Sequence, residues 1–221
     1  MSWQTSADPV LELTGDDPSY GPEPMHLSLL GRWQLRRDGV SVPLPTGAQR
    51  LVALVALWGP KSRTAIAGTL WPDGTERRAL GSLRTTLWRL QAAGLRVLTA
   101  EGGALALAPG VRVDVHEFLA CARTVARTNG DPGARATAVV LRGDELLPGW
   151  YDDWVLLERE RIHQLRLHAL EAISEQLLRS GRHADALEAA LAAVRAEPLR
   201  ESARRAAVRV HLAERNPTEA V

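Results

Sequence analysis

The stretch that decides the fold reads Asp73-Gly74-Thr75-Glu76-Arg77-Arg78-Ala79-Leu80-Gly81-Ser82-Leu83-Arg84-Thr85-Thr86-Leu87-Trp88-Arg89-Leu90. Leucines recur at helical spacing after Glu76, which predicts a helix that runs to about Ala93 and ends at Gly94. Asp73, with Glu76 three residues later, resembles a capping box, so we expect Asp73 to cap this helix.

The two faces of the predicted helix differ sharply in chemistry. At 100° per residue, Leu83 shares one stripe with five residues, which we expect to face the core: Glu76, Ala79, Leu80, Leu87 and Leu90. The opposite face has four arginines, two hydroxyls, a glycine, an aromatic side chain and no acid: Arg77, Arg78, Gly81, Ser82, Arg84, Thr85, Trp88 and Arg89. A merely solvated face normally mixes acids with the bases, so this one favours the major groove of double-stranded DNA.

The position of each side chain on this face predicts its role. Arg84 lies in the middle of the helix, so we expect it to read guanine, with Ser82 and Thr85 in support. The remaining arginines are expected to neutralise phosphates: Arg77, Arg78 and Arg89. For Trp88 two roles are open, packing against a neighbouring hairpin or touching thymine methyl groups, and we favour packing.

The flanking sequence predicts a winged helix around this reading helix. Alternating runs in residues 26–44 turn at Asp38-Gly39, a strong hairpin signal. Helices are then expected over 48–58 and about 64–71, before a second hairpin within 95–108. The order of sheet, three helices and hairpin is that of a winged helix with an N-terminal sheet. Its second hairpin, the wing, has no basic residue at the tip.

The remainder of the chain is predicted to be helical. Five helices are expected at about 115–128, 134–141, 152–180, 184–196 and 201–214. The long one should bury a stripe of Ile162, Leu165, Ala169, Ile173 and Leu177. Residues 182–187 loosely reappear as 216–221, a spacing of 34 residues, which is the tetratricopeptide period. Since the second repeat stops after one turn, we expect this domain to be incomplete at its C-terminus.

These patterns define a fold class and three segments. We expect a mainly α protein with small β-sheets, in which an N-terminal winged helix precedes an all-α tetratricopeptide-like domain. Residues 1–24 are predicted to be a disordered acidic tail, with five acids and no lysine or arginine. Residues 25–114 are the predicted DNA-binding domain, and residues 115–221 the helical domain.

Composition and side-chain spacing limit the classes of function that the chain can have. Residues 25–115 hold twelve basic residues against five acidic ones, which suggests a polyanionic partner. With Cys121 as the only cysteine, no internal disulfide and no cysteine-based zinc site can form. We expect a cytoplasmic protein that binds no membrane, cofactor or metal and is not an enzyme. The stretch Glu158-Arg159-Glu160-Arg161 has alternating charges, so we interpret it as a solvated, ion-paired helix face rather than an acidic site.

Several segments resemble the SARP family (Streptomyces antibiotic regulatory proteins). The resemblance rests on 27–31, Leu-Trp-Pro-Asp at 70–73, Ser-Leu-Arg-Thr-Thr-Leu-Trp-Arg-Leu at 82–90 and Val-Asp-Val at 113–115. In the C-terminal half, 146–155 (Leu-Leu-Pro-Gly-Trp-Tyr-Asp-Asp-Trp-Val) and 158–161 resemble the bacterial transcriptional activator domain of the same family.

The resemblance implies an OmpR-type winged helix that binds direct repeats and recruits RNA polymerase through its sigma or alpha subunit. It also implies that the third helix is the reading helix. We expect a homodimer on DNA and an activator of a secondary-metabolite gene cluster. Ala104 departs from the tyrosine that the family often has in its wing.

Two alternatives and one local ambiguity remain. The same DNA-binding head could serve a repressor or co-regulator, or the chain could be a tetratricopeptide-type scaffold that binds only protein. The aromatic stretch 149–154 could contact polymerase, but we favour a seam between domains, with Asp152 or Asp153 capping the long helix.

Overall fold

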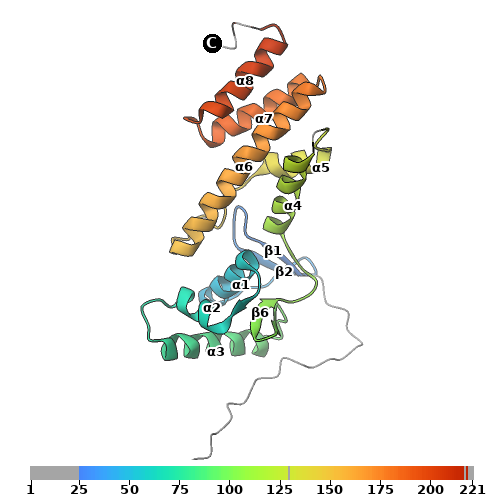
Figure 1. Ribbon diagram of the computed structural model, residues 1–221. Coiled ribbons are helices and arrows are strands. Elements are labelled where there is room, and N and C mark those ends of the chain that lie inside the picture. Colours follow the sequence, from blue (N-terminus) through green and yellow to red (C-terminus); the bar gives the residue numbers. More distant parts are fainter. Residues whose placement is uncertain (1–24, 129, 217, 219–221) are drawn as a thin grey trace, which may run out of the picture. The chain divides into compact units, whose positions relative to one another are not determined.

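The computed structural model describes residues 25–128, 130–216 and 218 (Figure 1). The predicted acidic tail and nearly all of the second predicted repeat lie outside the described residues. Small sheets occur up to residue 113 and only helices follow, which confirms the predicted fold class. The chain divides into two compact units, which are described separately.

Within the described chain, the first unit comprises residues 25, 37–40 and 44–111. Its elements are α1 (Thr46–Trp58), β4 (Lys61–Ser62), α2 (Arg63–Leu70), α3 (Glu76–Ala92), β5 (Leu98–Glu101) and β6 (Ala104–Leu107). α1 buries more residues than any other element of this unit, because six consecutive residues, Leu51 to Ala56, are buried. α2 adds Ile66 and Leu70, and α3 adds Leu83 and Leu90. These apolar stripes recur at helical spacing, as predicted.

The predicted wing is a hairpin within a three-stranded sheet of order β4-β6-β5. Leu98 lies opposite Leu107, and Glu101 opposite Ala104, so Gly102 and Gly103 form a two-residue turn. Both glycines have positive φ, 54° and 85°, as the tight turns that suit β-hairpins require. β4 pairs with β6, which places Lys61 opposite Leu105 and Ser62 opposite Ala104, close to the turn of the wing.

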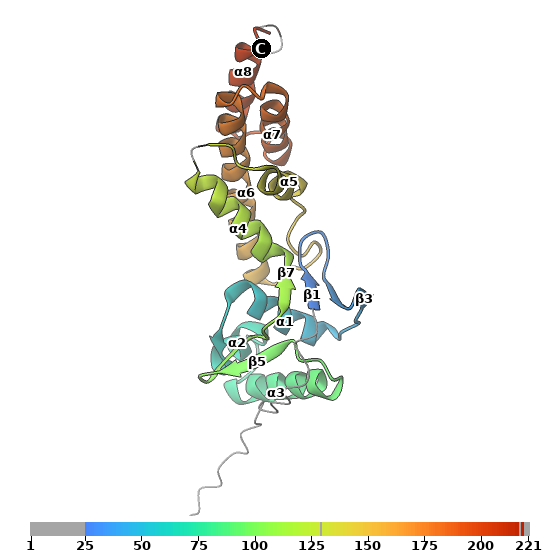
Figure 2. The same cartoon turned by 90° about the vertical axis from the view of Figure 1, so that its right-hand side faces the viewer.

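The second unit comprises residues 26–36, 41–43 and 112 onward. Its sheet has the order β3-β2-β1-β7, formed by β1 (Met25–Ser28), β2 (Gln34–Arg37), β3 (Val40–Ser41) and β7 (Val111–Val113). Its helices are α4 (Asp114–Arg127), α5 (Ala134–Arg142), α6 (Asp153–Arg179), α7 (His183–Ala196) and α8 (Glu201–Ala213). α6 packs against α4, α5, α7 and α8, and both ribbon views show α6, α7 and α8 side by side (Figures 1 and 2).

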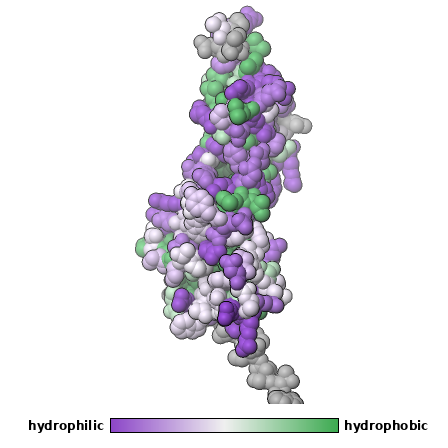
Figure 3. All heavy atoms as spheres, turned by 90° about the vertical axis from the view of Figure 1, so that its left-hand side faces the viewer, coloured by the Kyte–Doolittle hydropathy of each residue, from purple (hydrophilic) through white to green (hydrophobic). Residues whose placement is uncertain are grey.

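Alanines allow α7 and α8 to pack closely. The buried residues of α7 are all alanines: Ala186, Ala189, Ala190, Ala192 and Ala193. α8 buries Ala203, Ala206, Ala207 and Val210. On one face the space-filling view shows a largely hydrophilic surface over the helices, with small separate hydrophobic patches (Figure 3). No helix in the described part of the chain is long and apolar enough to cross a membrane.

Asp114 fastens the N-terminal strands to the helices of the second unit. Its carboxylate accepts hydrogen bonds from the backbone N–H groups of Leu29 and Leu30, both at 3.0 Å, and of Val115 at 2.7 Å. Burial raises the pKa of the Asp114 carboxyl above its ordinary value, and these amide donors oppose the rise. This attachment explains why residues 26–36 group with the helices, whereas the predicted domain division at 114 places them with the winged helix.

A second attachment involves Arg159. Its guanidinium donates to the carbonyls of Leu146 (2.9 Å), Leu147 (2.7 Å) and Trp150 (2.9 Å). Arg159 also pairs with Glu145 at 3.0 Å, and Arg161 pairs with Glu158 at 2.7 Å, as expected for an ion-paired face. The prediction of a solvated face is wrong for Arg159 alone, whose side chain is only 20% exposed. Three guanidinium bonds to one short segment make Arg159 a loop clamp.

Three further details differ from the sequence predictions. The N-cap of α3 is Thr75, so Asp73 does not cap the helix, and Glu76 is exposed rather than in the core. Leu165 is 37% exposed, although the other four residues of its predicted stripe are buried. Asp152 occupies the N-cap position of α6, but its side chain makes no capping hydrogen bond.

Candidate nucleic-acid interface

α3 lies at the edge of the first unit, beyond α1 and α2 (Figure 1). Its inner side is held by Ala79, Leu83 and Leu90, which are at most 4% exposed. Leu80 and Leu87 of the predicted core stripe are half-buried. The opposite side is therefore turned away from the core over the full 17 residues of the helix.

Six of the seven predicted contact residues are exposed on that side: Arg77, Arg78, Arg84, Thr85, Trp88 and Arg89. The seventh, Ser82, is half-buried, so its hydroxyl is less accessible than predicted. The structure thus places the predicted residues on one helix face, with Ser82 at its margin.

The four arginines of this face have no hydrogen-bond or ion-pair partner among the described residues. Arginines elsewhere in the chain do pair: Arg135 binds Glu117 at 2.7 Å, and Arg182 binds Asp185 at 2.7 Å. A guanidinium without a carboxylate partner keeps its donors available for phosphate or guanine, which it can bind in a bidentate manner. The face therefore combines positive charge with unused hydrogen-bond donors.

The smaller residues of the face leave room for a ligand. A Cβ added at Gly81 would meet nothing within 4 Å, so the helix surface there is open. The Thr85 hydroxyl donates to the Gly81 carbonyl at 3.1 Å, which fixes its orientation and leaves its oxygen able to accept. A close approach of another surface to the middle of α3 is therefore sterically allowed.

Trp88 does not pack as we favoured. Its side chain is 61% exposed, and the packing interpretation is therefore wrong. The remaining interpretation, contact with an apolar group on a bound partner, is compatible with this exposure.

The structure adds two basic residues that the sequence analysis did not assign to the interface. Lys61 is exposed on β4, next to β6 of the wing. Arg63 begins α2, and its guanidinium reaches the carbonyl of Gly103 in the wing turn at 3.5 Å. The signal for both was the short basic stretch after Gly59-Pro60, but only strand pairing brings it to the wing. Basic charge thus lies beside the turn of the wing, although the hairpin itself carries Glu101 there.

Among the described residues, no three His, Cys, Asp or Glu side chains are placed to share a metal ion. The basic face of α3 therefore remains the strongest candidate site in the first unit.

Comparison with known proteins gives three findings. Residues 113–221 match the family model of the bacterial transcriptional activator domain. A solved structure of Mycobacterium tuberculosis EmbR, in complex with a low-affinity phosphopeptide, is similar in fold, with a TM-score of 0.71 at 20% identity. The match covers 90% of this chain and 57% of the EmbR chain, so this chain spans little more than half of that protein. No curated protein sequence matches the chain.

The family match begins at residue 113, beside Asp114 and the first of the five helices, and includes the Arg159 clamp. Residues 113–221 are thus similar to a bacterial transcriptional activator domain, and the fold of the chain is similar to that of EmbR.

Proposed function

We propose that the chain is a sequence-specific DNA-binding regulator in which residues 25–114 bind DNA and α3 enters the major groove. The observation that carries this proposal is the face of α3 with four partnerless arginines and no acid. A major groove is wide enough for such a helix, and its guanine edges suit arginine forks.

Position along α3 suggests which side chain reads bases. Arg84 is the ninth of the 17 residues, so its side chain would lie over the centre of the contact. We assign base reading to Arg84, supported by Thr85 and by Ser82 at the margin. Arg77, Arg78 and Arg89 would bind phosphates, and exposed Trp88 would touch a thymine methyl group.

The regulatory step is proposed from the family. In this proposal the protein activates transcription by binding direct repeats as a homodimer and recruiting RNA polymerase through its sigma or alpha subunit, at a secondary-metabolite gene cluster. A repressor or co-regulator with the same head would bind the same sites without raising transcription. In vitro transcription from a bound promoter distinguishes the two, since only an activator increases the yield of transcript.

DNA binding is tested first by selecting duplexes from a random pool and measuring affinity for selected and scrambled duplexes by fluorescence anisotropy. Arg84→Ala should cost about 1–3 kcal/mol on the selected duplex and much less on the scrambled one. Arg78→Ala should weaken both about equally and reduce the salt slope by roughly one.

The matched control is Arg123→Ala, because Arg123 is an exposed, partnerless arginine of α4 in the second unit. This variant should bind like the wild type. Equal weakening of both duplexes by Arg84→Ala would make Arg84 a phosphate contact. If the wild-type chain selects no sequence from the pool, sequence-specific DNA binding is excluded. The alternative of a scaffold that binds only protein is then favoured.

A further inference from the structure

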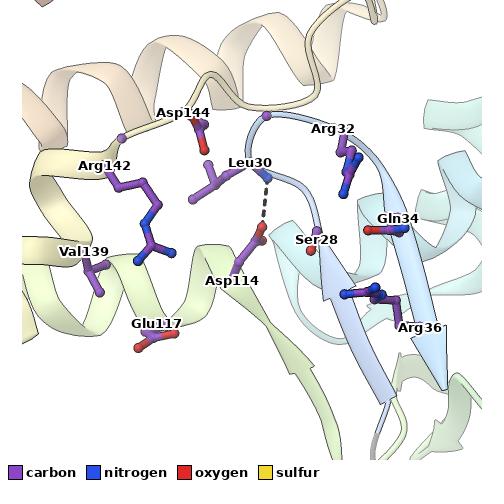
Figure 4. Close-up of a pocket in the computed structure, with 12 residues that line it drawn as sticks. Ser28, Leu30, Arg32, Gln34, Arg36, Asp114, Glu117, Val139, Arg142 and Asp144 are labelled. Carbon is purple, nitrogen blue, oxygen red and sulfur yellow. Dashed lines mark hydrogen bonds between the residues drawn. The ribbon is translucent and has the colours of Figure 1, made fainter. Parts of the chain in front are cut away.

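A cleft of about 500 Å³ lies within the second unit, between the N-terminal strands and helices α4 and α5 (Figure 4). Its volume is in the range of small-molecule sites. Arg32, Gln34 and Arg36 line it from the β1–β2 side, and Arg142 at the end of α5 lines it from the other. Figure 4 shows Arg142 on one side of Leu30 and Asp114, and Arg32 and Arg36 on the other.

None of these three arginines has a hydrogen bond or an ion pair with another residue in the described part of the chain. Two arginines nearby are engaged: Arg135 of α5 binds Glu117, and Arg166 donates to the carbonyls of Val140 and Leu141. The cleft thus has unused guanidinium groups on both of its walls.

The carboxylates of the cleft form no direct ion pair with these arginines in the described chain, although the lining holds three acids and three arginines. Asp114 already accepts three backbone N–H groups, and Glu117 binds Arg135 at 2.7 Å. Asp144 is exposed and pairs with no arginine of the cleft in the described chain. These carboxylates still have lone pairs that can accept hydrogen bonds from hydroxyl groups.

We propose that this cleft binds a small bisphosphorylated ligand whose two phosphate groups are joined by a hydroxyl-bearing spacer, as in a sugar bisphosphate. Arg142 binds one phosphate, and Arg32 and Arg36 bind the other, each with the planar fork that suits phosphate oxygens. The hydroxyl groups of the spacer donate to Asp144 and to Oε2 of Glu117, the oxygen that Arg135 does not bind. The proposal concerns the second unit alone and does not depend on DNA binding by α3.

The probe is fructose 1,6-bisphosphate, compared with fructose 6-phosphate and inorganic phosphate by isothermal titration calorimetry on the full chain. We expect saturable binding of the bisphosphate, and weaker binding of both compounds with a single phosphate. Arg142→Gln and Arg36→Gln should each lower the affinity for the bisphosphate by about tenfold or more, because each substitution removes hydrogen bonds to a charged group.

Two controls separate this cleft from other basic surfaces. Arg123→Gln removes an exposed arginine of α4 outside the cleft, and Arg78→Ala removes a guanidinium from α3. Both should bind the bisphosphate like the wild type, and Arg78→Ala separates this site from the proposed DNA face. Absence of saturable binding, equal affinity for fructose 6-phosphate, or an equal loss in either control would overturn the proposal.

Discussion

Replacing Arg159 should destabilise the second unit far more than replacing an arginine on the open surface would. The Arg159 side chain is only 20% exposed, and its guanidinium bonds three carbonyls of the segment that leads into α6. One of those carbonyls belongs to Leu147, a buried residue with a φ of +43°, a conformation that costs about 1–3 kcal/mol for a side chain other than glycine. The clamp therefore holds a strained backbone in place.

The expected loss in the free energy of unfolding follows from the hydrogen bonds that the substitution removes. Hydrogen bonds to a charged group contribute about 1.5–3 kcal/mol each, and water can reach part of this site, so Arg159→Ala should cost about 3 kcal/mol in total. Arg159→Lys should lose somewhat less, because an ammonium can reach only some of the three carbonyls.

Urea unfolding followed by far-UV circular dichroism measures the effect on the helical transition. The control is Arg161→Ala, two residues away, which breaks only the partly exposed pair with Glu158 and should cost at most about 0.5 kcal/mol. If Arg159→Ala is no more destabilising than this control, the clamp contributes nothing to stability and the argument fails.

Three further substitutions test other contacts of the second unit. Gly143→Ala should lower stability by about 3 kcal/mol in a thermal melt, because the new Cβ overlaps the Arg166 guanidinium and Gly143 has a φ of +34°; an unchanged melting temperature would contradict this. Asp114→Ala should cost about 2–4 kcal/mol, since it leaves three amide groups without an acceptor, and should speed amide exchange at the end of β1; protection equal to the wild type would exclude this role. Burial opposes ionisation of Glu171, but hydrogen bonds from Arg200 and Ser202 outweigh it and lower the pKa of this carboxyl below its ordinary value of 4.5. The ionised carboxylate therefore stabilises the fold above that ordinary value, and its contribution fades as the pH falls through the lowered pKa. Glu171→Gln should therefore be less stable than the wild type at neutral pH in urea unfolding, with a difference that shrinks in acid; a difference independent of pH would refute the assignment.

The helices and hairpins were predictable from local sequence because local sequence determines them. Leucine spacing located α3 to within one residue at its C-terminal end, and Gly102-Gly103 located the turn of the wing. The capping prediction failed at Asp73 because two residues, Gly74 and Thr75, precede the first helical residue. Patterns of this kind locate an element better than they locate its first residue.

The α3 face was predictable for the same reason, since a helix fixes which residues share a side. The burial of residues at the margins of this face was not predictable, because it depends on neighbouring elements. Ser82 is half-buried beside the rest of the first unit, whereas Trp88 is 61% exposed. Lys61 and Arg63 reached the wing only through the pairing of β4 with β6, which the sequence pattern did not reveal.

The segments of the family resemblance that flank the first unit, 27–31 and those from residue 113 onward, meet in the second unit. This meeting separates their structural role from the DNA-reading role proposed for α3. Leu29 donates to the carboxylate of Asp114, 85 residues away, and accepts from the backbone N–H of Leu147 at 2.8 Å. Leu147 is in turn held by Arg159. Four segments that resemble the family in sequence (27–31, 113–115, 146–155 and 158–161) are thus joined by one connected set of hydrogen bonds, and none of them belongs to the face of α3. Substitutions in this set should alter stability without changing sequence preference, so differences in operator choice between such regulators should map to the exposed residues of α3.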